Sequence, residues 1–112
     1  MRLSCFLLVL LAATPASALT GTELKRFCDE PKGGSGNISC SAYIRGLIDG
    51  LFLADHMAGS GVRYCPPENL ELEQALLVVQ KHLNEHPEQL NRNAGPLAAL
   101  ALYSAFPCKG SN

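Results

Sequence analysis

The sequence lacks an excess of basic charge, a long hydrophobic run and the glycine patterns of nucleotide-binding enzymes. Its 112 residues include 9 Lys and Arg against 10 Asp and Glu, so no polybasic surface is available for nucleic acid or an anionic membrane. The N-terminal apolar run, residues 3–13, is shorter than the roughly 20 residues of a bilayer-spanning helix. No P-loop or dinucleotide-binding fingerprint is present, and the length fits one domain.

The apolar run is typical of a secretory signal peptide. Arg2 precedes it, and Ala16-Ser17-Ala18 supplies the small-residue pattern of a cleavage site. We expect residues 1–18 to be removed after Ala18, leaving a periplasmic domain over residues 19–112 with no membrane anchor. This domain loses one of the nine basic residues and none of the ten acidic ones, so its net charge is −2.

Helical periodicity runs through most of the remaining chain, and no segment alternates with period two. We therefore predict an all-α fold, a small disulfide-bonded bundle of about four helices. The predicted helices cover residues 19–30, from Ser39 or Ser41 to about 57, 69–85, and 93 to about 106, with Thr20 or Thr22 as the first N-cap. Pro31 ends the first helix, and glycine-rich residues 32–36 are expected to form a flexible loop.

The predicted helices differ in their apolar patterns. The second has a continuous stripe of Cys40, Tyr43, Ile44, Leu47, Ile48 and Leu51, and another face with Ala42, Gly46 and Gly50 spaced by four. Because glycine inside a helix costs ~1 kcal/mol relative to alanine, these small residues indicate a close backbone approach. We favour an approach within the chain over a dimer groove. The last helix is almost wholly apolar and should be the most buried element.

Four cysteines remain in the exported domain, Cys28, Cys40, Cys65 and Cys108, an even number that is typical of disulfides in an oxidising compartment. If the last three helices run up, down and up, the bundle favours the pairs Cys28–Cys40 and Cys65–Cys108. The pairs Cys40–Cys65 and Cys28–Cys108 stay open, because the loop after the second helix could retrace much of it. An extended chain covers ~3.3 Å per residue, against 1.5 Å in a helix.

His82 and His86 lie four residues apart on a predicted helix, a spacing that can place two imidazoles on one zinc ion. A zinc site needs three or four protein ligands, and only Glu85 and Glu88 lie nearby in the sequence. No Glu follows His82 directly, so the metalloprotease pattern is absent. We expect surface histidines, with no metal and no other cofactor.

Catalytic constellations are also missing. No Gly-x-Ser-x-Gly elbow or Ser-x-x-Lys pair occurs, and Asp49 and Asp55, six apart on a helix, point in different directions. The acidic residues Glu68, Glu71 and Glu73 lie near the positive end of the third helix dipole, where carboxylates are favourable without any catalytic role. The sequence therefore predicts a protein that is not an enzyme.

The order of several short motifs resembles the Rap/Tai family of immunity proteins. Residues 40–50, Cys-Ser-Ala-Tyr-Ile-Arg-Gly-Leu-Ile-Asp-Gly, look like the family's Cys-x-x-Tyr-Ile-x-Gly-x-x-Asp opening. Later landmarks follow in order: Cys65-Pro66-Pro67, Gln74, Val78-Val79, His82-Leu83, His86-Pro87, Ala101-Leu102 and Ala105-Phe106-Pro107-Cys108. The resemblance covers about residues 23–108, with Glu71 standing where a capping Thr or Ser is expected.

This resemblance implies a periplasmic, all-helical, disulfide-bonded inhibitor that acts as a homodimer. Its partner would be a peptidoglycan amidase toxin delivered by type VI secretion, with its Cys–His active site blocked by a connector between helices. By position that connector is residues 84–92, whose side chains are expected to point to solvent. The expected partner-binding residues are Asn84, His86, Glu88, Gln89, Asn91 and Arg92, together with Arg45 and Asp49 on the exposed edge of the second helix.

Two alternatives come from other classes. A small helical periplasmic acid-stress chaperone of the HdeA kind would loosen on acidification and expose apolar faces, which three histidines and a modest acidic excess permit. Light scattering at low pH with an unrelated client protein distinguishes the chaperone hypothesis from the inhibitor hypothesis. The second alternative is a helical module that binds a metal or a small ligand, and this hypothesis depends on His82 and His86.

Overall fold

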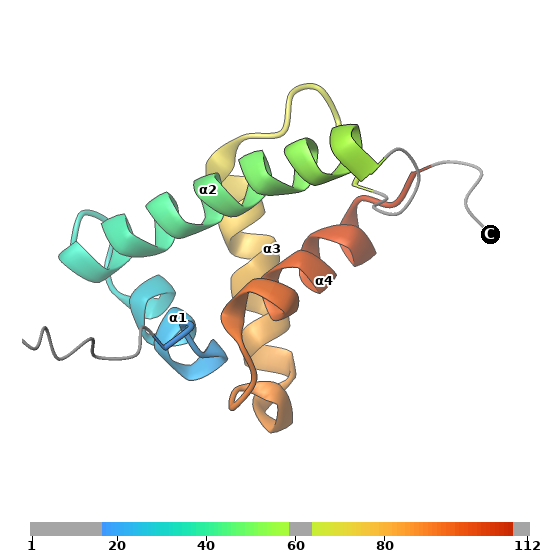
Figure 1. The fold of residues 1–112 in the computed structure, drawn as a ribbon. Helices are drawn as coiled ribbons and strands as arrows, with labels where there is room; N and C mark the ends of the chain where they lie inside the picture. The colour runs from blue at the N-terminus through green and yellow to red at the C-terminus, as the bar shows by residue number, and fades with distance from the viewer. Residues whose placement is uncertain (1–16, 59–63, 109–112) are drawn as a thin grey trace, which may run out of the picture.

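The computed structural model describes residues 17–58 and 64–108. The elements are α1 (Gly21–Asp29), α2 (Ser35–Ala58), α3 (Leu72–Glu85), the 3-10 turn η1 (Pro87–Gln89) and α4 (Ala94–Ala105), arranged as in Figure 1. The described part contains no strand, only an isolated β-bridge between Thr20 and Asn93, and the predicted all-α class is confirmed. None of the described helices is long and apolar enough to cross a bilayer. Most of the predicted signal peptide, residues 1–16, lies outside the described residues.

α1 begins with a capping box, in which the two ends of a four-residue segment satisfy each other's backbone groups. The Thr20 hydroxyl accepts a hydrogen bond from the Glu23 backbone N–H at 3.2 Å, and the Thr20 N–H donates to the Glu23 carboxylate at 2.8 Å. The bond from the Thr20 N–H, and then a 3.2 Å bond from the Thr20 hydroxyl to the same carboxylate, lower the pKa of Glu23. Of the two predicted caps, Thr20 is therefore the N-cap of α1.

α2 starts at Ser35, earlier than the predicted start at Ser39 or Ser41. The carboxylate of Glu30 accepts a 2.7 Å hydrogen bond from the Gly36 N–H and so caps the helix from the preceding segment. Ser39 and Ser41 instead lie inside the helix, and their hydroxyls donate to backbone carbonyls four residues earlier. The expected flexible loop over residues 32–36 is thus too long, because its last two residues are helical.

The path from α2 to α3 also differs from a simple up-down-up bundle. Residues 64–71 run back along α2, so α3 starts beside the middle of α2 and crosses it steeply (Figure 1). Eight residues of extended chain can reach ~26 Å, which is enough to move the start of α3 away from the end of α2. α3 begins at Leu72, three residues after the predicted start.

The core lies where the four helices meet and is built almost wholly of aliphatic side chains. Its buried members are Leu24, Cys28, Cys40, Ile44, Leu51, Tyr64, Ala75, Val79, Leu83, Ala94, Leu97, Ala98, Ala101 and Leu102. α4 supplies five of them, more than any other helix, so the expectation that it is the most buried element is confirmed, although Leu100 on its outer side is half exposed. The prediction of a close approach within the chain at Gly46 and Gly50 is wrong for the described residues, since none of their atoms lies within 4 Å of where the two Cβ atoms would be.

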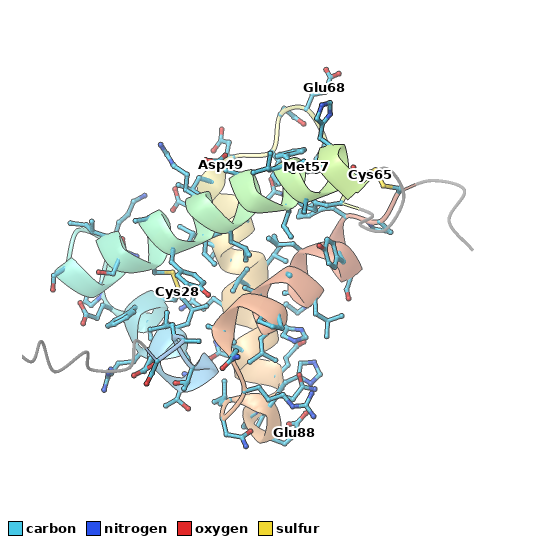
Figure 2. The ribbon with its side chains drawn as sticks, viewed as in Figure 1. Cys28, Asp49, Met57, Cys65, Glu68 and Glu88 are labelled. Atoms are coloured by element: carbon cyan, nitrogen blue, oxygen red, sulfur yellow. A yellow bond between two sulfur atoms is a disulfide. The ribbon has the colours of Figure 1, made fainter. Side chains whose placement is uncertain are left out.

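Both disulfides that the sequence favoured are present. Cys28 pairs with Cys40 across a separation of 12 residues, and Cys65 pairs with Cys108 across 43. Figure 2 shows them at opposite ends of α2. The first joins α1 to α2, and the second ties the start of the 64–71 segment to the chain after α4. The Cys65 N–H also donates to the Phe106 carbonyl at 3.1 Å.

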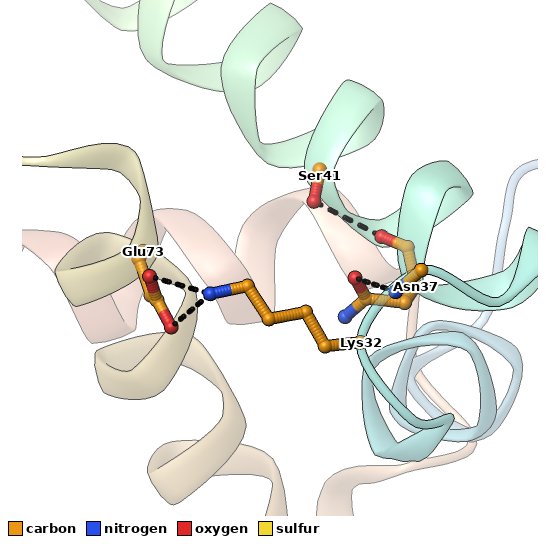
Figure 3. A network of polar contacts seen from close by, with 5 residues as sticks. Lys32, Asn37, Ser41 and Glu73 are labelled. Atoms are coloured by element: carbon orange, nitrogen blue, oxygen red, sulfur yellow. Dashed lines mark hydrogen bonds and ion pairs between the residues drawn. The ribbon is translucent and has the colours of Figure 1, made fainter.

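A polar contact holds the α1–α2 turn against α3 (Figure 3). The ammonium of Lys32 lies 3.1 Å from both carboxylate oxygens of Glu73, while the Asn37 amide oxygen accepts from the Gly33 N–H at 3.5 Å. Gly33 has φ +92°, a conformation that favours glycine. Since Lys32 and Glu73 are exposed, their ion pair is worth no more than about 1 kcal/mol.

Candidate functional site

The connector between α3 and α4 is a hydrogen-bonded turn. Pro87 occupies the first position of η1, where its missing N–H is not needed. The N–H groups of Gln89, Leu90 and Arg92 donate to the carbonyls of His86, Pro87 and Gln89 at 3.0, 3.3 and 2.9 Å. Residues 86–92 therefore hold one another in a defined shape between two helices.

The same connector is fastened to the start of α1, nearly 70 residues away in sequence. The Gly21 N–H donates to the Arg92 carbonyl at 2.8 Å, and the Thr22 N–H donates to the Leu90 carbonyl at 2.9 Å. At the first residue of α4, the Ala94 N–H donates to the Leu19 carbonyl at 2.7 Å. We call these three backbone hydrogen bonds the α1 clamp. Sequence reasoning missed the α1 clamp, since no periodicity relates the two segments.

Most of the predicted binding residues on the connector face solvent. Asn84, Glu88, Asn91 and Arg92 are exposed, and Figure 2 shows Glu88 at the tip of the molecule, at the C-terminal end of α3. The expectation is wrong for Gln89: its side-chain oxygen is buried and has no hydrogen-bond partner among the described residues. The outward surface of the connector consequently offers a carboxylate, two amides and a guanidinium.

The rings of His82 and His86 lie next to each other beside the connector, tilted by 40°. Their ring centroids lie 4.3 Å apart, and Nδ1 of His86 lies 3.2 Å from the Glu88 carboxylate. Burial, and then the nearby His86, lower the pKa of His82. The backbone N–H of Glu88 and the His86 ring lower the pKa of Glu88, which is therefore an anion at neutral pH. The described residues contain no group of three or more His, Cys, Asp and Glu placed to hold a metal ion.

Arg45 and Asp49, the other predicted binding residues, lie far from the connector. Both are exposed on α2, and Figure 2 places Asp49 at the opposite end of α3 from Glu88. The 14 residues of α3 separate the two ends by ~21 Å. The structure therefore does not unite the predicted surface: it divides it into the connector and a second region on α2. That second region borders a groove whose aromatic residues, Phe52 and Tyr64, the sequence did not single out.

The fold and connector define a small, disulfide-bonded helical protein that presents a rigid polar turn, with no catalytic constellation recognised in its sequence. The model of the Rap1a immunity proteins matches residues 20–108, and the chain belongs to this family. It is accordingly an immunity protein for a secreted toxin, of a class that inhibits without catalysis. Its disulfides and its family indicate an exported protein. Comparison with curated proteins and with solved structures finds no match.

Proposed function

We propose that this protein is exported to the periplasm after cleavage at Ala18 and there inhibits a peptidoglycan amidase toxin delivered by type VI secretion. It acts without catalysis of its own. Residues 84–92 enter the groove that holds the toxin's Cys–His pair and exclude the substrate. The observation that carries this proposal is the α1 clamp, which fixes the C-terminal part of a connector whose exposed side chains are polar.

The clamp matters because a loop that is already ordered loses little conformational entropy when it enters a cleft. Pro87 restricts the backbone further. Glu88 supplies a hydrogen-bond acceptor, Arg92 a fork of donors, and Asn91 both kinds of group. A cleft built around a thiol and an imidazole offers partners for each of these side chains.

We further propose that the active form is a homodimer assembled through the exposed face of α2. This face carries Ala42, Gly46 and Gly50, flanked by Ile38, Leu53 and Met57, and Met57 is 77% exposed. Because no described atom lies within 4 Å of where the Cβ atoms of residues 46 and 50 would be, a second helix can approach the backbone there. Sedimentation of the wild type and of Gly46→Arg tests the dimer: the wild type should sediment as a dimer and the variant as a monomer.

Titration calorimetry against the amidase, inactivated at its cysteine, tests the toxin proposal. The variant Glu88→Ala/Asn91→Ala/Arg92→Ala should bind at least tenfold more weakly, equivalent to about 1.4 kcal/mol, with unchanged circular dichroism. A matched control, Glu73→Ala/Gln74→Ala/Lys81→Ala, removes an acid, an amide and a base from the exposed surface of α3 and should bind as the wild type does. No binding by the wild type, or equal loss in both variants, would contradict the proposal.

A further inference from the structure

A groove of about 590 Å³ lies between α2 and the 64–72 segment, at the opposite end of α3 from the connector. Its volume is within the range of roughly 300–1,000 Å³ that small ligands and side chains occupy in binding sites. The floor is apolar and is made by Ile48, Phe52, Leu70, Leu72 and Ala75. Covering such a surface with an apolar group removes it from water and so favours binding.

Phe52 shows that the described residues leave the groove unfilled. Its side chain is 50% exposed although it lies within the apolar floor. The ring packs on that of Tyr64, with centroids 5.4 Å apart. A large aromatic side chain left half open beside a concave apolar surface is a feature of binding sites.

Tyr64 forms part of the wall of the groove. It is only 3% exposed and lines the groove, while its hydroxyl oxygen is buried and has no hydrogen-bond partner among the described residues. Burial raises the pKa of Tyr64, so the side chain stays neutral. Tyr64 therefore adds apolar ring surface to the groove and no charge.

The rim of the groove is predominantly acidic. The groove is lined by Asp49 on α2 and by Glu68 and Glu71 on the neighbouring segment, and Arg45 is the single basic residue among its described lining residues. Figure 2 shows Asp49 and Glu68 at the same end of the molecule. Within the described part of the chain, none of these three carboxylates takes part in an ion pair. The rim therefore favours a cationic occupant.

We propose that this groove binds an apolar segment of a partner protein that carries a lysine or arginine beside its apolar side chains. The apolar side chains cover Phe52 and Leu72, and the cation lies among the rim carboxylates. The site is remote from the connector and does not depend on the identity of the toxin.

Nuclear magnetic resonance titration of the ¹⁵N-labelled protein with the peptide acetyl-Leu-Arg-Leu-amide tests the proposal. Saturable shifts should appear at the backbone amides of Phe52, Leu70 and Leu72, and acetyl-Leu-Glu-Leu-amide should bind at least fivefold more weakly. Shifts that map to the connector, shifts that do not saturate, or equal affinity for both peptides would overturn the proposal. The titration needs no toxin, so a protein that binds the cationic peptide but not the amidase would refute only the proposed amidase inhibition.

Variants test the acidic rim. Asp49→Asn/Glu68→Gln/Glu71→Gln should weaken binding of the cationic peptide at least fivefold, while Glu73→Gln, the neighbouring acid that pairs with Lys32 instead, should leave it unchanged. Equal binding by the rim variant and by Glu73→Gln would contradict the assignment.

Discussion

The backbone N–H of Gly21 donates a 2.8 Å hydrogen bond to the carbonyl oxygen of Arg92, which joins the first turn of α1 to the connector. The bond gives a free N–H at a helix N-terminus a partner. At the same time it fixes the backbone beside the exposed Arg92 side chain. The order of the proposed toxin-binding surface therefore depends on a helix that does not itself belong to that surface.

Replacing Gly21 should test this dependence. A Cβ at Gly21 would lie 2.7 Å from the Leu97 side chain and 3.0 Å from the Leu90 carbonyl oxygen. We expect Gly21→Ala to destabilise the fold by about 1–3 kcal/mol, the usual cost of overpacking, and to weaken toxin binding. Thermal unfolding followed by circular dichroism measures the first effect. In the control, Gly95→Ala, the new Cβ would make an ordinary contact with the Tyr43 hydroxyl at 3.4 Å, and the stability of the fold should stay the same or rise slightly; an equal response from both variants would contradict the crowding at Gly21.

The cap of α2 gives a second test. Glu30→Ala removes the carboxylate that accepts from the Gly36 N–H, so we expect a loss of about 0.5–2 kcal/mol, as for other N-caps. Ser39→Ala removes only an exposed hydroxyl inside the helix and should be neutral or slightly stabilising, because alanine is the better helix former. Urea denaturation of both variants measures the difference. A larger loss of stability for Ser39→Ala than for Glu30→Ala would instead support the later helix start that the sequence predicted.

These two helix starts show what the sequence could and could not predict of the fold. Thr20 was identifiable because its capping partner, Glu23, lies three residues further along. Glu30 was not, since it caps α2 from across a turn whose shape depends on the positive φ of Gly33. The apolar stripes predicted the buried faces correctly, because burial follows helical periodicity. The crossing of α3 over α2 depends on the path of residues 64–71, which carries no periodic signal.

The candidate site was predictable in position but not in organisation. Polar residues between two apolar helices predicted the exposed connector, and this holds for Glu88 and Arg92. The burial of the Gln89 side-chain oxygen and the hydrogen bond from Gly21 depend on tertiary contacts between segments distant in sequence. Arg45 was assigned to the same surface from the family resemblance alone, and the fold places α2 at the other end of α3.

The stability of the fold should decline on mild acidification because of His82. Burial, and then the neighbouring His86, lower the pKa of His82 below its usual 6.5, while Glu85 and Glu88 act more weakly in the opposite direction. The folded protein thus holds this proton less tightly than the unfolded chain does. The contribution of His82 to the free energy of unfolding is fully present above about pH 6.5. It is lost as the pH falls through 6.5 towards the lower pKa of His82 in the folded protein.

Urea denaturation at several pH values between 8 and 5 measures this effect. The free energy of unfolding of the wild type should fall across the lower half of that range, and His82→Gln should flatten the fall. The control variant His56→Gln changes an exposed histidine at the far end of α2 and should retain the wild-type profile. A profile that His82→Gln leaves unchanged would show that another group controls the acid sensitivity.

The two disulfides should contribute unequally to stability. Cys65–Cys108 closes 43 residues and Cys28–Cys40 closes 12. A cross-link that closes a longer loop removes more conformational entropy from the unfolded chain, so the chain-entropy model gives about 4 kcal/mol for the first and about 3 kcal/mol for the second. Guanidinium denaturation of Cys65→Ser/Cys108→Ser and Cys28→Ser/Cys40→Ser measures the two losses, and a reversed order would show that native-state contacts outweigh loop length.

Their effects on binding should differ as well. Cys65–Cys108 anchors the segment that forms one wall of the groove at α2, whereas the α1 clamp holds the connector independently. Cys65→Ser/Cys108→Ser, measured where it remains folded, should therefore lose affinity for the cationic peptide and keep its affinity for the amidase. Cys28→Ser/Cys40→Ser, which frees α1 from α2, should weaken amidase binding more, because α1 carries the donors that hold residues 90 and 92. Equal effects of both variants on both ligands would mean that the two ends of the molecule are not independent.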